Sequence, residues 1–159
     1  MQTSLVAGAL AGCLATVPMT AAMMVLHRLL PLRQRYPLPP AQVTRRLAAR
    51  FGLGRHTSSG EWSVPVLLSH FAYGTAGGAV YALGARAIPL PPAIGGAAYG
   101  LAIWLASYLG LLPAFGLQRS ATEQPNRRRA LMVVAHLVWG VCLDVALRGL
   151  LPPPTSGSR

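Results

Sequence analysis

The stretch "ALMVVAHLVWGVCLDVALRGLL", residues 130–151, decides the fold because it is a continuous apolar run of the length that crosses a bilayer. A transmembrane helix needs about 20 predominantly apolar residues. Inside this run, four residues follow one another at a spacing of four: His136, Gly140, Asp144 and Arg148. Residues at this spacing lie on one slowly winding face of a helix. The stretch therefore predicts a membrane helix with a polar stripe that faces other helices.

Three further apolar stretches approach or exceed the same length, about residues 5–30, 64–88 and 93–117. Their continuous hydrophobicity predicts helices, because the strands of membrane barrels are shorter and alternate. The chain is 53% hydrophobic and 11% charged, whereas soluble domains carry about 25% charged residues. We therefore predict an all-α fold, a polytopic transmembrane four-helix bundle that forms one membrane domain over residues 1–151. A disordered tail is expected over residues 152–159.

The distribution of arginine predicts how the bundle is oriented. All fourteen basic residues are arginines, and eleven of them lie within residues 28–55 and 119–129, the first and third connections between the predicted spans. Arginine-rich connections stay in the cytoplasm, so we expect both termini outside. The lack of lysine and the abundance of Ala, Gly and Pro indicate a GC-rich bacterial genome, and hence the bacterial inner membrane. The basic clusters lack interleaved aromatic residues, so we expect no nucleic-acid partner.

The first connection contains a sequence typical of a short amphipathic helix over about residues 40–51. Prolines precede it, and Val43, Leu47 and Phe51 recur at a spacing of four. We expect this helix to lie in the headgroup layer on the cytoplasmic side, where basic side chains meet anionic lipids. The side chains expected at the lipid headgroups are those of Arg45, Arg46 and Arg50. Docking of a partner protein is the alternative use of this helix.

Small residues indicate where the predicted helices approach one another. Gly74 and Gly78 form one GxxxG motif, Gly96 and Gly100 form a second, and Gly140 lies in the polar stripe. Membrane helices associate where small residues let their backbones come close. We expect these glycines to pack helices within the bundle, and the alternative is that one such face joins two copies in a homo-oligomer.

Asp144 and Arg148 are expected to form an ion pair within the last helix. An acidic residue four positions before a basic one is the favourable order for such a pair. Either charge alone at membrane depth would cost at least about 2.5 kcal/mol. Two hypotheses follow: a neutralised structural pair that fixes the depth of the helix, or proton or ion handling by Asp144 together with His136.

Three histidines are predicted to lie at one level of the membrane. His70 lies six residues into the second span, His136 lies six residues into the fourth, and His27 ends the first. A layer of imidazoles could bind a divalent metal, ligate haem or relay protons. Hydrogen bonds across helices are the simpler use, and we predict no cofactor from this pattern.

The last three predicted spans carry a resemblance to a known group. The sequences "HFAYGTAGGAVYAL" (70–83), "LAIWLASYLGLLPAFGL" (101–117) and "AHLVWGV" (135–141) resemble small uncharacterised bacterial inner-membrane proteins of the YagU-like group, whose last helix has a similar His-Leu-Val-Trp run. The resemblance implies a membrane location. It implies no activity and no catalytic residues.

The sequence gives no positive indication of an enzyme. No nucleophile lies beside a base at a recognisable catalytic spacing, and Glu61 and Glu123 are isolated acids in predicted loops. We therefore favour a structural or accessory membrane protein. The alternatives are a small transporter or proton-handling subunit that uses the polar stripe, and a haem- or metal-binding membrane protein that uses the histidines.

Overall fold

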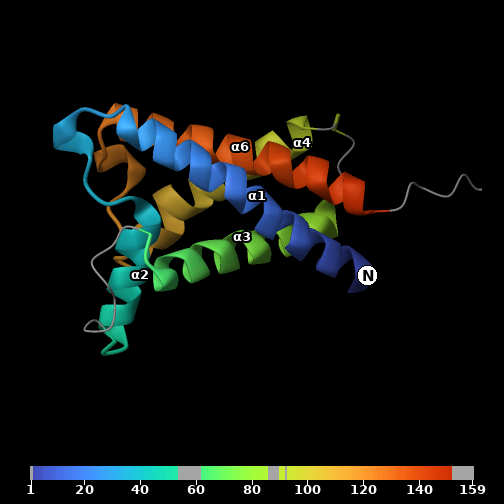
Figure 1. Cartoon of the computed structure of the whole chain (residues 1–159), viewed down its shortest axis with the longest axis horizontal. Coiled ribbons are helices and arrows are strands. Elements are labelled where there is room, and N and C mark those ends of the chain that lie inside the picture. Colours follow the sequence, from blue (N-terminus) through green and yellow to red (C-terminus); the bar gives the residue numbers. More distant parts are fainter. Residues whose placement is uncertain (1, 54–61, 86–89, 92, 152–159) are drawn as a thin grey trace, which may run out of the picture.

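A computed structural model describes residues 2–53, 62–85, 90–91 and 93–151, and all regular secondary structure in these residues is helical (Figure 1). The predicted tail, residues 152–159, lies outside the described residues. The long helices are α1 (Gln2–Arg28), α3 (Val64–Gly84), α4 (Ile94–Leu105) and α6 (Asn126–Leu150). A π-helix, η3 (Ala106–Leu111), and a single turn, α5 (Leu112–Ala114), continue α4. The connections contain α2 (Pro39–Arg50) and two 3-10 turns, η1 (Leu32–Gln34) and η4 (Ala121–Glu123).

Three helices in the described residues are long and apolar enough to cross a membrane, which indicates a membrane protein: Ser4–Arg28, Ile94–Ala114 and Asn126–Leu150. The second predicted span corresponds to α3, which is not among them. Four glycines, two tyrosines and His70 lower its mean hydropathy. Hydropathy therefore supports three of the four predicted spans in the part of the chain that the structure describes.

The side chains of α1 are distributed as lipid exposure requires. The face of α1 that contacts the other helices consists of small residues. Ala11 and Ala15 are buried there, and Gly12 lies between them. Its opposite face carries the large exposed side chains Val6, Leu10, Leu14 and Val17. A water-soluble helix buries its large apolar residues instead. In lipid there is no such drive, so helices pack through small residues and leave large ones in contact with lipid tails.

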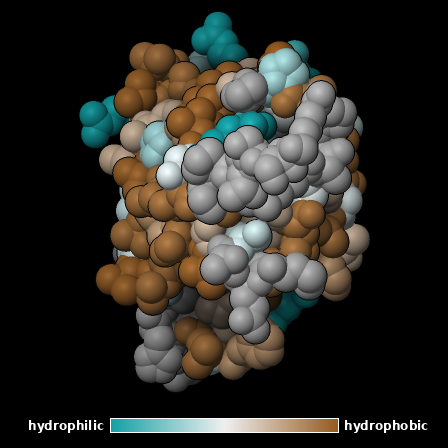
Figure 2. Space-filling view, turned by 90° about the vertical axis from the view of Figure 1, so that its right-hand side faces the viewer, coloured by the Kyte–Doolittle hydropathy of each residue, from teal (hydrophilic) through white to brown (hydrophobic). Residues whose placement is uncertain are grey.

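The described helices form one packed body with two distinct ends (Figure 1). α1 packs along both α3 and α6, and α4 packs along α6. The N-terminus of α1 and the C-terminus of α6 lie at the same end, and α2 lies at the other. Viewed from the end at which α6 finishes, hydrophobic residues make up most of the coloured surface (Figure 2).

Hydropathy did not indicate two details of the helices: the residue at which α6 begins and the π-helix within the third span. α6 begins at Asn126, four residues before the apolar run, because arginine is a good helix former and residues 127–129 extend the helix beyond its apolar part. The third span contains a π-helix, which ends immediately before Leu112 and Pro113. Proline removes a helical hydrogen bond and clashes with the preceding turn, so regular α-helical hydrogen bonding is disturbed at this point of the span.

Candidate functional site

The closest contact between α1 and α3 uses two GxxxG motifs that face each other. A Cβ atom at Gly78 would overlap the backbone of Gly8 and Gly12, and a Cβ atom at Gly12 would overlap the carbonyl oxygen of Gly74. Thr16 continues the contact, with its hydroxyl donating to the Gly12 carbonyl at 2.8 Å. The motif on α1 was missed by our sequence analysis, although Gly8 and Gly12 stand at the required spacing.

The contact between α4 and α6 has the same character. A Cβ atom at Gly96 would overlap the carbonyl oxygen of Gly140, and one at Gly100 would overlap the carbonyl oxygen of His136. The stripe on α6 therefore faces α4. Both predicted GxxxG motifs lie between helices of the same chain.

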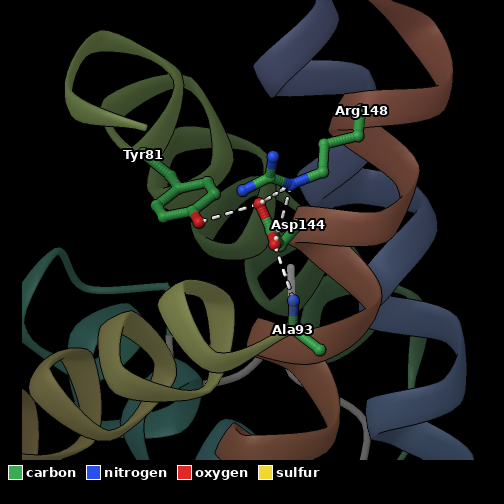
Figure 3. Close-up of polar contacts among 4 residues, drawn as sticks. All are labelled: Tyr81, Ala93, Asp144 and Arg148. Carbon is green, nitrogen blue, oxygen red and sulfur yellow. Dashed lines mark hydrogen bonds and ion pairs between the residues drawn. The ribbon is translucent and has the colours of Figure 1, made fainter. Parts of the chain in front are cut away.

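This close approach brings Asp144 into a cluster of three donors (Figure 3). The phenol of Tyr81 donates to Oδ1 at 2.9 Å, and the backbone N–H of Ala93 donates to Oδ2 at 2.9 Å. Nε of Arg148 lies 3.0 Å from Oδ1 and 3.1 Å from Oδ2. Asp144 is 1% exposed, whereas the side chain of Arg148 is 45% exposed. The carboxylate thus ties α3, the start of α4 and α6 together.

Ala93, the residue before α4, has an unusual backbone conformation that suits this cluster. Its φ is 69° and its ψ is −36°. Non-glycine residues rarely adopt positive φ because Cβ approaches the backbone. Here the conformation presents the Ala93 N–H to Asp144 at the N-terminus of α4, where a negative charge is stabilised by the helix dipole. Neither Ala93 nor Tyr81 carries a sequence signal for this role.

A cavity of about 240 Å³ lies between α1, α3, η3 and α6, with α2 forming its remaining wall. The glycine contacts hold the helices together nearer the Asp144 end, and Figure 1 shows α1 and α6 diverging from α3 toward the end that carries α2. Tyr73 and Leu47 line the cavity and are also exposed, so the cavity reaches the surface beside α2.

The polar groups around this cavity come from α1, α2, α3, η3 and α6. The hydroxyls of Tyr73 and Ser107 are hydrogen-bonded at 2.6 Å, which joins α3 to the π-helix. Nδ1 of His136 lies 2.8 Å from the Met132 carbonyl, and the ring meets Tyr108 edge-on at 5.6 Å between centroids. Nε2 of His70 is buried and has no hydrogen-bond partner among the described residues. Thr16, Thr44 and Ser69 add three hydroxyl groups, which are hydrogen-bonded within the protein, and the rest of the wall is aliphatic and aromatic.

The predicted histidine layer is only partly formed. His70 and His136 line the same cavity, but His27 does not. On α1 the cavity is lined by Thr16 and Met19, and His27 stands eight residues further on, about 12 Å along the axis. Within the described ranges, no three His, Cys, Asp or Glu side chains are grouped so as to hold a metal ion.

Arg46 and Arg50, which we expected at lipid headgroups, also contact backbone carbonyls of the protein. Arg46 donates to the carbonyl of Gly116 at 3.2 Å, and Arg50 donates to the carbonyl of Phe115. These carbonyls follow α5 and cannot be satisfied within the helix, so arginine is a favourable partner there. The two arginines therefore attach α2 to the end of the third span. Arg45 is half-buried.

Arg128, at the start of α6, has a role that the sequence did not reveal. It is 2% exposed and donates to the carbonyls of Gln34, Tyr36 and Pro37 at 2.8 to 3.0 Å. Its guanidinium also lies 3.6 Å from the centre of the Tyr36 ring, a cation–π contact. One of the arginines that we used only for orientation thus organises the connection between α1 and α2.

Comparison with known proteins identifies a family. Residues 28–145 match the family described as protein of unknown function (DUF1440). The matched region runs from the end of α1 to the residue after Asp144, and it includes both cavity histidines. Neither the curated proteins nor the solved structures gave a match.

Proposed function

We propose, for a chain that belongs to DUF1440, a family of proteins of unknown function, that it is a non-catalytic structural or accessory protein of the bacterial inner membrane. The observation that carries this proposal is the hydrogen bonding of the Asp144 carboxylate. Its two carboxylate oxygens receive donors from Tyr81, Ala93 and Arg148. A buried carboxylate with this set of donors is a structural tie between helices, because taking up a proton would break the ion pair and weaken the cluster.

The proposal includes α3 as a fourth span. Its 21 residues extend about 31 Å, which matches the hydrocarbon core of a bilayer. It packs along α1, a helix that is itself long and apolar enough to cross. Large exposed side chains also occur along its length, from Val64 and Leu68 to Val80 and Leu83. A helix that packs against α1 on one side and exposes large apolar side chains elsewhere is best accommodated beside α1 in the membrane.

The proposal also places the end that carries α2 in the cytoplasm and both termini outside. The described arginines at that end are Arg28, Arg33, Arg35, Arg45, Arg46, Arg50, Arg119, Arg127, Arg128 and Arg129. The positive-inside tendency favours this orientation. In this arrangement α2 lies at the cytoplasmic interface, near anionic lipids. The glycine faces lie inside the chain, so a second copy or a membrane partner would contact another surface.

Replacing Asp144 by Asn tests this function against proton handling. We expect Asp144→Asn to lower the free energy of unfolding by about 1–3 kcal/mol, because one acceptor oxygen and the ion pair are lost. Glu123→Gln removes the same charge from an exposed turn and should leave stability unchanged. The measurements are denaturant unfolding in detergent and proton flux into proteoliposomes that contain a pH-sensitive dye.

The two functions give different results in this experiment. We expect neither the unchanged protein nor the variants to increase proton flux above that of empty liposomes. An accessory role would be contradicted by a pH-dependent flux that Asp144→Asn abolishes while the stability of the protein is retained.

A further inference from the structure

The cavity beside α2 has the size of a ligand site. An apolar cavity of about 150 Å³ can hold benzene, so the cavity of about 240 Å³ has room for roughly ten non-hydrogen atoms. It reaches the surface at Tyr73 and Leu47, which are exposed. Because Tyr73 lies in the middle of α3, a molecule dissolved in the bilayer could enter there.

The lining residues exclude a charged ligand. No acidic side chain and no arginine is among the described residues that line the cavity, although α2, which forms one wall, carries three arginines. An ion placed in this cavity would lose its hydration without gaining a charged partner, which costs several kcal/mol. The occupant is therefore neutral.

His136 determines which polar group the ligand carries. The contact of Nδ1 with the Met132 carbonyl requires a proton on Nδ1, because a carbonyl oxygen can only accept. The neutral ring then has a lone pair on Nε2, for which the described residues supply no partner. This nitrogen is able to accept a hydrogen bond from a hydroxyl group. Nε2 of His70, buried and without a hydrogen-bond partner among the described residues, is a second group of the same cavity that the ligand could satisfy.

The aromatic part of the wall determines the shape of the ligand. Tyr73, Tyr108 and Trp139 all line the cavity, and Tyr108 also meets the His136 ring edge-on. Aromatic side chains interact with another ring through stacked or edge-on contacts, each worth about 0.5–1.5 kcal/mol beyond the area that they bury. A flat ring therefore fits this wall better than a flexible chain does.

We propose that this cavity binds a neutral aromatic alcohol, a molecule of the phenol class that partitions into the bilayer and donates its hydroxyl proton to His136. This inference goes beyond the accessory role, and its failure would leave that role untouched. The proposed ligand does not involve Asp144, whose carboxylate already has its hydrogen-bond partners within the protein.

The test measures binding of three related probes to the full chain in lipid nanodiscs. The probes are 2-naphthol, naphthalene, which lacks the hydroxyl, and 2-naphthoate, which is an anion at pH 7. Equilibrium dialysis against empty nanodiscs of the same lipid corrects for partition into the bilayer. We expect 2-naphthol to bind saturably, naphthalene to bind at least tenfold more weakly, and 2-naphthoate to bind no more than to empty nanodiscs.

Two variants locate the site. His136→Phe keeps an aromatic ring but removes the acceptor nitrogen, so it should abolish the preference for 2-naphthol over naphthalene. Val43→Phe fills the cavity from α2 and should weaken the binding of 2-naphthol and of naphthalene at least tenfold. Ala49→Phe, on the exposed face of the same helix, should leave the binding of both probes unchanged. The proposal is overturned if 2-naphthol does not bind above the empty-nanodisc level. It is equally overturned if either variant at a cavity position folds and binds 2-naphthol as the unchanged protein does.

Discussion

Ala93 shows how one residue can be strained and still be useful to the fold. Its positive φ directs its N–H to Asp144, and the hydrogen bond offsets part of the cost of the conformation. For a residue with a Cβ atom, a left-handed conformation costs about 1–2 kcal/mol. The cluster at Asp144 therefore holds Ala93 in a conformation that glycine would adopt without strain.

Replacing Ala93 by glycine should consequently stabilise the protein. The change removes the strain but increases the freedom of the unfolded chain, so we expect a net gain of about 0.5–1 kcal/mol in the free energy of unfolding. Ala98→Gly, at an exposed position inside α4, should cost about 1 kcal/mol. Thermal and denaturant unfolding in detergent measure both variants. A loss of stability with Ala93→Gly would show that the backbone there is not strained.

Sequence reasoning reached some residues of the cluster and not others. Asp144 and Arg148 stand on one helix at a fixed spacing, so their proximity followed from helix geometry alone. Tyr81 and Ala93 come from other elements, and their approach depends on how closely α4 packs against α6. Periodicity along one helix carries no information about such contacts between helices.

The helices depend on glycine at their crossings rather than on apolar burial. α6 offers a matched pair of positions, because Gly140 faces the backbone of Gly96 while Gly149 has open space around its Cβ position. Gly140→Ala should destabilise the protein by about 1–3 kcal/mol through overpacking. Gly149→Ala should be neutral or stabilising by up to about 1 kcal/mol, because alanine favours the helix. Unfolding in detergent distinguishes the two, and equal effects would argue against the observed crossing of α4 and α6.

The connection between α1 and α2 should depend on the shape of the Arg128 side chain as well as on its charge. A lysine keeps the charge but cannot present a planar fork to three carbonyls and stack on Tyr36. We expect Arg128→Lys to lower the free energy of unfolding by about 2 kcal/mol. Arg127→Lys, on the exposed neighbouring position, should change it by less than about 0.5 kcal/mol. Proteolysis near residues 31–38 should also become faster in Arg128→Lys alone.

Hydropathy was informative for the elements and less so for their details. The apolar runs predicted the positions of the long helices, because membrane insertion depends on summed hydrophobicity. The π-helix and the arginine contacts of α2 were not foreseen, since both depend on backbone groups that neighbouring segments leave unsatisfied. Arginine counts could suggest a side of the membrane but could not distinguish a buried arginine from one at a lipid headgroup.

At the scale of the molecule, the two ends differ in charge and should face different compartments. Single cysteines can report this in a background that carries Cys13→Ala and Cys142→Ala. We expect Thr122→Cys, on the exposed turn η4, to react with an impermeant maleimide only in permeabilised cells. Leu90→Cys, at the opposite end before α4, should react in intact cells. The reverse pattern would invert the orientation that we propose.

The carbonyls that bind Arg128 precede it by 91 to 94 residues in the chain. During synthesis, the segment between α1 and α2 therefore emerges long before the guanidinium that gathers it. A nascent chain that ends before α6 contains that whole segment but lacks Arg128, whose side chain holds the segment in place. The contacts that fix the segment between α1 and α2 therefore form only after the first turn of α6 has been synthesised.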